Sequence, residues 1–139
     1  MSKVVSIRLK PEVWKRLEAM ARRLGRRPGE TSALLIDEAL RCAEFAFIQF
    51  RDSAAGRQAY VVGTSLAVWE VVFLLRYFDG DPERLARHLG WPVAKVKAAL
   101  NYAEAYPEEI QAAIADNERG PEILRRTIPD LDRVIVDEP

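Results

Sequence analysis

Residue types that perform catalysis are scarce in this chain and do not form a recognisable catalytic pattern. The single histidine, His88, falls on an expected short helix, where a capping or surface role is the common one. The single cysteine, Cys42, lies near the end of an apolar helix face, where a buried structural thiol is expected rather than a nucleophile. Glu108 and Glu109 follow Pro107 in an expected first helical turn, where the helix dipole favours carboxylates. Because zinc-site spacings and glycine-rich phosphate loops are also missing from the sequence, we expect no enzyme, no metal and no cofactor.

A different chemistry is available near the N-terminus, where polar and apolar residues alternate. Residues 4–10 have the period of two that is typical of a half-buried strand, with Val5, Ile7 and Leu9 on one face. Two such strands paired antiparallel fit the major groove of B-DNA, where arginine grips guanine, serine bonds either base type and valine meets a thymine methyl. The opposite face therefore predicts base contacts from Val4, Ser6 and Arg8.

Two helices are expected to position this strand. An apolar stripe at spacings of three and four predicts a helix that begins at Pro11 and ends before Gly25. Residues 26–29 are expected to form a turn, after which Thr31 or Ser32 would cap a second helix that runs through residue 43. One strand and two helices cannot satisfy the strand's own hydrogen bonds, so we expect pairing with the same strand of a second copy, in a two-fold homodimer.

Charge supports a nucleic-acid partner for this end of the chain. The whole protein is neutral, but residues 1–41 contain ten Lys and Arg against five Asp and Glu, a net charge of +5. The start of the second helix offers backbone N–H groups to a phosphate. The residues expected to contact DNA phosphates are Lys10, Arg26, Arg27, Gly29, Thr31 and Ser32. A ribbon that only dimerises the chain, with a solvated polar face, remains the alternative.

The same residues resemble a known family. The run VSIRLKPEVWKRLEAMA from residue 5, followed by PGETSALLIDEAL from residue 28, is similar to ribbon–helix–helix repressors of the CopG/Arc type. The resemblance covers about the first 43 residues. It implies that Val4, Ser6 and Arg8 read bases and that residues 29–32 clamp phosphates. The basic loop from Arg26 to Gly29 is longer than the family's pattern.

The remainder of the chain predicts a second, mostly helical domain. A short strand is expected over residues 57–62, after a turn over residues 51–56, and helices over residues 68–78, 83–89, 93–106 and 108–117. Thr64 or Ser65 is expected to cap the first of these helices, and Asp81, which Pro82 follows, the second. The two middle helices flank Gly90, which predicts a unit like a helix-turn-helix. Only Lys95 and Lys97 are basic on its second helix, so packing is favoured over groove reading.

Residues 47–118 resemble a second family, an antitoxin-like domain of unknown function 433. The similarity is carried by GR at residue 56, VGTSLAV from residue 62, GDP from residue 80, ALNYA from residue 99 and YPEEI from residue 106. Members are small helix-turn-helix-like proteins, many of them encoded beside a PIN-like ribonuclease toxin. The resemblance implies a VapB-type antitoxin.

The tail after residue 118 is apolar and acidic, and residues 101–139 carry four basic and ten acidic residues. If a toxin is the partner, this segment is the expected contact, with Arg125, Arg126 and Arg133 as candidates for its acidic metal pocket. Packing on the dimer mate, or partial disorder, is the alternative for the tail. The longest apolar stretch, residues 66–75, is too short to span a bilayer, and no signal peptide is present, so we expect a cytoplasmic protein with no membrane partner.

Together these observations predict a mainly helical α+β homodimer. Its parts would be a ribbon–helix–helix over residues 1–43, a helical domain with a helix-turn-helix and a short β-hairpin over residues 45–118, and a tail over residues 119–139. The expected function is a repressor that binds double-stranded operator DNA, neutralises a PIN-like toxin and regulates its own operon. A plain regulator, a protein-interaction scaffold, or a regulator whose second domain senses a ligand beside Trp69, Phe73 and Tyr77 remain alternatives.

Overall fold

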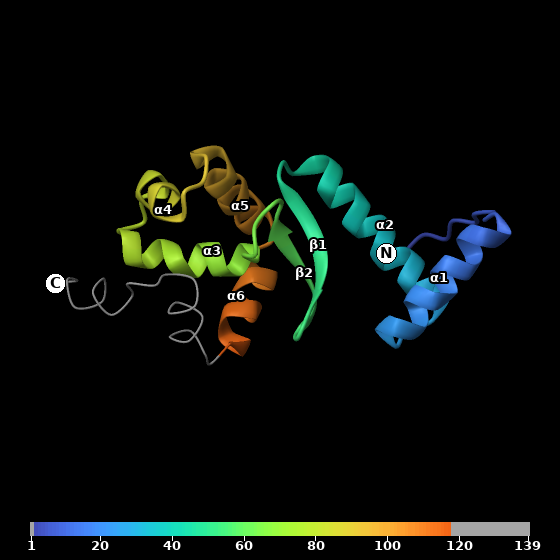
Figure 1. Cartoon of the computed structure of the whole chain (residues 1–139). Helices are drawn as coiled ribbons and strands as arrows, with labels where there is room; N and C mark the ends of the chain where they lie inside the picture. The colour runs from blue at the N-terminus through green and yellow to red at the C-terminus, as the bar shows by residue number, and fades with distance from the viewer. Residues whose placement is uncertain (1, 118–139) are drawn as a thin grey trace. The chain divides into compact units, whose positions relative to one another are not determined.

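The chain consists of two compact units, which are described separately. The computed structural model describes residues 2–117 (Figure 1). The first unit comprises residues 1–41 and the second residues 42–139. This division falls near residue 43, where the sequence indicates the end of the N-terminal module. The architecture is mainly helical with one small antiparallel sheet, as expected.

The first unit is built from helices α1 (Pro11–Leu24) and α2 (Pro28–Glu44). The predicted end of α1 is confirmed, because Gly25 adopts the left-handed conformation at φ 66° and its neighbour Arg26 donates its N–H to Ala21 O over 2.9 Å. Only a residue without a Cβ adopts this backbone conformation without strain, so Gly25 ends the helix and turns the chain towards α2.

The predicted start of α2 is wrong. The helix begins at Pro28, so Thr31 and Ser32 lie inside its first turns and do not cap it. Their hydroxyl groups donate back to the preceding turn, to Arg27 O over 3.0 Å and to Pro28 O over 2.9 Å. Proline favours the first helical position because its missing N–H has no helical partner there. That preference outweighs the capping preference of the hydroxyl residues.

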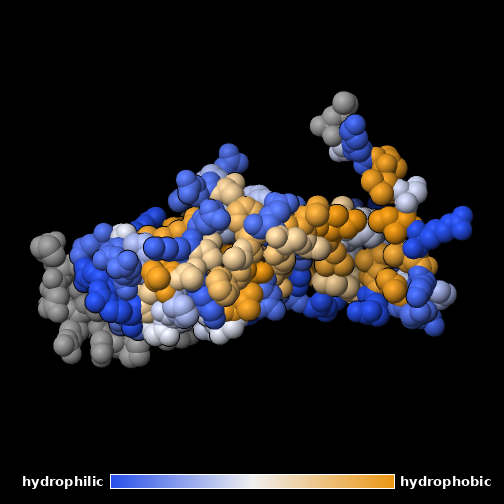
Figure 2. Space-filling view, turned by 90° about the horizontal axis from the view of Figure 1, so that it is seen from above, coloured by the Kyte–Doolittle hydropathy of each residue, from blue (hydrophilic) through white to orange (hydrophobic). Residues whose placement is uncertain are grey.

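Residues 2–10, which include the strand predicted over residues 4–10, belong to no helix or strand in the single chain. The apolar side chains of this segment are uncovered: Val5 is 75%, Ile7 60% and Leu9 40% exposed. The hydrophobic residues of this N-terminal segment stand free of the rest of the unit in Figure 2. A strand is defined by hydrogen bonds to a neighbouring strand, and this unit supplies no neighbour.

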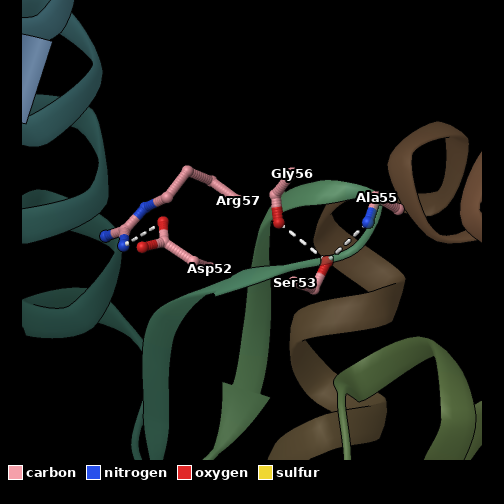
Figure 3. Close-up of polar contacts among 5 residues, drawn as sticks. All are labelled: Asp52, Ser53, Ala55, Gly56 and Arg57. Atoms are coloured by element: carbon pink, nitrogen blue, oxygen red, sulfur yellow. Dashed lines mark hydrogen bonds and ion pairs between the residues drawn. The ribbon is translucent and has the colours of Figure 1, made fainter. Parts of the chain in front are cut away.

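The second unit opens with a β-hairpin of β1 (Ile48–Ser53) and β2 (Gly56–Val61), whose register pairs Ser53 with Gly56. The predicted turn over residues 51–56 is therefore too long, since only two residues, 54 and 55, link the strands. Ser53 closes the turn: its Oγ donates to Gly56 O over 2.7 Å and accepts from Ala55 N over 3.1 Å (Figure 3). Gly56 supplies the positive φ of 101° that so short a connection needs.

Helices follow the hairpin in the predicted order. They are α3 (Val68–Leu75), which continues as the 3₁₀-helix η1 (Arg76–Phe78), then α4 (Pro82–Leu89), α5 (Val93–Ala105) and α6 (Pro107–Asp116). α3 contacts α5 and α6, and α4 contacts α5. The core of the unit lies between these helices and β2. Its fully enclosed side chains are Val61, Ala67, Val68, Val71, Leu74, Leu85, Val96, Ala99 and Tyr102.

Two helix starts in this unit test the capping predictions. Asp81 caps α4 as predicted, because its carboxylate accepts a hydrogen bond from Glu83 N over 3.0 Å and Pro82 follows it. The predicted cap of α3 by Thr64 or Ser65 is wrong. Ala67 precedes α3, and Glu70 reaches back to accept from Ala67 N over 3.2 Å. Across residues 2–117, no helix combines the length and apolarity that crossing a bilayer requires.

Candidate nucleic-acid interface

The predicted base-reading residues lie on the segment that precedes α1. Val4, Ser6 and Arg8 are all exposed, and Val4 is 95% exposed. Lys10, the last residue before α1, has the extended backbone conformation at φ −63° and ψ 150°. Its carbonyl accepts the first hydrogen bonds of the helix, from Val13 N and Trp14 N. The helix thus anchors one end of the segment while its side chains remain open to solvent.

The start of α2 differs from the expected phosphate clamp. Thr31 is fully buried, and both its N–H and its hydroxyl group donate to Arg27 O. Since Pro28 has no N–H, the helix start offers a phosphate the backbone amides of Gly29 and Glu30. A Cβ added at Gly29 would meet no atom within 4 Å, so packing does not require glycine there. The helix amides that remain available to the expected phosphate are therefore those of residues 29 and 30, and not of residues 29–32.

Arginines surround this helix start. Arg26 and Arg27 are exposed in the loop between α1 and α2, as expected, and Arg22 is exposed in the last turn of α1. Cations near a helix C-terminus stabilise the helix through its dipole, which is an ordinary structural role for Arg22. The loop arginines lie beside the amides at the start of α2, where the helix dipole attracts an anion. The positive charge of the loop arginines and the dipole of α2 therefore both favour an anionic ligand.

The apolar side of the first unit is incompletely covered. Within its described residues the only buried hydrophobic residue is Ala21. Trp14 is 44%, Ile36 46% and Leu40 55% exposed. Ile36 was missed by the sequence reasoning, although its spacing of four residues from Leu40 places both on one helix face. These side chains and those of residues 5–9 therefore form an exposed apolar surface on this unit.

The predicted helix-turn-helix is present as α4, the turn from Gly90 to Pro92, and α5. Gly90 ends α4 in the left-handed conformation at φ 70°. Lys95, one of the two basic residues on α5, donates from Nζ to Val62 O over 3.0 Å. Lys97 is exposed. With one of its two cations bound to the loop that follows β2, α5 resembles a packing helix more than a groove-reading one.

The other candidate residues from the sequence lie in the tail and in the second unit. Arg125, Arg126 and Arg133 lie outside the described residues. In the second unit, Trp69 is buried and its Nε1 donates to Gln58 Oε1 over 3.3 Å. Among residues 2–117, no group of three or more histidine, cysteine or acidic side chains comes together as metal ligands would.

No protein-family model, no curated protein and no solved structure matches this chain.

Proposed function

We propose that this protein is a dimeric, sequence-specific DNA-binding repressor. The observation that carries the proposal is the extended N-terminal segment, with apolar side chains uncovered on one face and Ser6 and Arg8 exposed on the other. Pairing with a second copy would satisfy the backbone and cover the apolar face in one step. The face left over would then be a two-stranded ribbon of the width that the major groove accepts.

Electrostatics supports DNA as the ligand of this ribbon. The module's net charge of +5 becomes +10 in a dimer, and Arg26 and Arg27 lie next to the free amides of α2. Phosphate contacts of this kind provide affinity without sequence preference, while the ribbon supplies the preference. Affinity for DNA and preference for a sequence would thus depend on different residues of the same small module.

Salt dependence separates a DNA-binding ribbon from one that only dimerises the chain. A dimer that contacts several phosphates releases their counterions, so its affinity falls by about three to five powers of ten between roughly 50 and 200 mM salt. The measurement is a fluorescence-anisotropy titration of a labelled duplex from the chain's own promoter. An affinity for the duplex that does not change across this salt range would refute DNA binding by the ribbon and favour the scaffold alternative.

Arg8 tests the groove assignment. Replacing Arg8 by Ala should cost about 1–3 kcal/mol of discrimination per contacted guanine and leave the dimer intact. Arg16, which is exposed on α1, is the matched control, because Arg16→Ala removes the same charge from outside the ribbon. If both variants retain wild-type discrimination between promoter and random DNA, Arg8 does not read bases.

The resemblance of residues 47–118 to antitoxin-like domains extends the proposal to neutralisation of a PIN-like ribonuclease. We propose Arg125, Arg126 and Arg133 as its contacts, since a nuclease metal site is lined by carboxylates. The test is co-expression with the product of the neighbouring gene. Rescue of growth by the wild type, and loss of rescue when all three arginines become alanine, are expected. If no nuclease is encoded there, the antitoxin part fails and the DNA-binding part stands.

A further inference from the structure

Two cations of the second unit converge on the loop that follows β2. Arg51, on β1, donates from its NH1 group to Thr64 O over 2.7 Å. Lys95, near the start of α5, donates from Nζ to Val62 O over 3.0 Å. The other hydrogen bonds of the Arg51 guanidinium go to Gln49 Oε1, over 3.3 Å from Nε and 2.9 Å from NH2. All of these acceptors are uncharged oxygens.

Neither cation has a carboxylate partner among residues 2–117, whereas other arginines of the unit do. Arg57 pairs with Asp52 over 3.2 Å, and Arg84 pairs with Asp79. A guanidinium has five N–H groups and an ammonium has three, so Arg51 and Lys95 retain donors beyond those already engaged. Hydrogen bonds to backbone oxygens thus fix two positive charges that no carboxylate among residues 2–117 neutralises.

An exposed apolar surface adjoins these charges. Phe47 is 42% and Val62 39% exposed, and the Lys95 ammonium lies 5.9 Å from the centre of the Phe47 ring. Phe47 has a φ of 60°, a left-handed conformation that is costly for a bulky residue and that clusters at functional positions. Gly63 leaves room for the Lys95 ammonium, because a Cβ at this position would lie only 3.2 Å from Lys95 Nζ. We call Phe47, Arg51, Val62 and Lys95 the cation–aromatic patch.

The net charge of residues 42–117 decides which kind of anion fits the patch. Residues 42–117 contain seven Lys and Arg against ten Asp and Glu, a net charge of −3. A long polyanion such as DNA would be repelled by this unit, while a short peptide can place one carboxylate between the two cations. The apolar half of the patch further favours a peptide whose carboxylates alternate with aliphatic side chains.

We propose that the patch binds the chain's own segment of residues 128–138, which lies outside the described residues. This sequence, IPDLDRVIVDE, contains four acidic residues against one arginine, interleaved with aliphatic residues. Ten residues lie between Asn117, the last described residue, and Ile128, so eleven Cα–Cα steps connect the two. They span up to about 36 Å when extended, which exceeds the diameter of roughly 25–30 Å for a domain of this size. The segment therefore carries the acidic and aliphatic side chains that suit the patch, and the linking chain is long enough for it to reach the patch.

Carbodiimide cross-linking of the full chain tests the proposal, because the reagent joins an amine to a carboxylate in direct contact. Lys97 is the internal control, since it is exposed two residues from Lys95 on the same helix. We expect at least about tenfold more product between Lys95 and residues 130–138 than between Lys97 and the same residues, because tethering acts equally on both lysines and only docking at the patch brings the carboxylates to Lys95. Peptide mapping by mass spectrometry gives the yields.

Charge reversal strengthens the test. Arg51→Glu should lower the Lys95 product about tenfold, while Arg76→Glu, at an exposed position of the same unit, should not change it. Equal products from Lys95 and Lys97 in the wild type, or products only with lysines of residues 1–41, would overturn the proposal whether or not the variants fold. Mixing ¹⁵N-labelled and unlabelled chains identifies the origin of the segment. A product that joins two copies would overturn the assignment to the same chain.

Discussion

Replacing Ile7 by Ser should separate dimerisation of the first unit from folding of the second. Full burial of an isoleucine side chain is worth about 1.5–3 kcal/mol, and Ile7 is 60% exposed in the single chain, so covering it contributes about 1–2 kcal/mol per copy. Both copies lose this contribution, which gives about 2–4 kcal/mol per dimer and raises the dissociation constant about 30- to 1,000-fold. The second unit has its own core and should keep its helical signal.

Sedimentation equilibrium over a range of concentrations measures the dissociation constant, and circular dichroism checks the second unit. Val4→Ser is the matched control, because it makes a similar aliphatic-to-hydroxyl change on the opposite face, at a residue that is 95% exposed. It should leave the dimer within about twofold of wild type, since a residue that stays in solvent contributes little to association. If Ile7→Ser dimerises like the wild type, or if Val4→Ser weakens the dimer equally, the ribbon model is wrong.

Three further substitutions probe the framework. Asp81→Ala removes the cap of α4 and should lower the free energy of unfolding by about 0.5–2 kcal/mol in a urea titration. Gly25→Ala forces a Cβ into the left-handed region and should destabilise the first unit by about 1–2 kcal/mol, whereas Gly29→Ala, at an ordinary φ, should not; thermal melts of the two variants decide. Tyr102→Phe deletes the 2.7 Å hydrogen bond to Glu109 and should cost about 0.5–1.5 kcal/mol in the same urea assay, and an unchanged midpoint would contradict this.

Much of the helical framework follows from local sequence. Gly25 and Gly90 end helices in the left-handed conformation, and Asp81 and Pro82 begin one, as their residue types predict. These outcomes depend on backbone sterics and on hydrogen bonds within a few residues, so no distant contact is needed to specify them. Trp69 and Tyr102 are buried because aromatic side chains have a large apolar area to remove from water.

Other features could not be predicted from local preferences. Thr31 and Ser32 have good capping side chains, but Pro28 begins the helix earlier, so both hydroxyls turn back onto the helix backbone. At α3, the cap is supplied by Glu70 reaching back to Ala67. In each case two acceptable local solutions compete, and the residue types alone do not say which of them prevails.

The sequence by itself determined the alternation of residues 4–10, the positive charge of the first unit and the acidic character of the chain's end. These are properties of composition and period, which survive any arrangement of the elements. Only the tertiary structure brought Arg51 of β1 and Lys95 of α5 onto one loop, 44 residues apart in the chain. It also showed that the apolar face of residues 5–9 finds no cover within its own unit. Both are relations between distant segments, because burial and charge compensation depend on which surfaces meet.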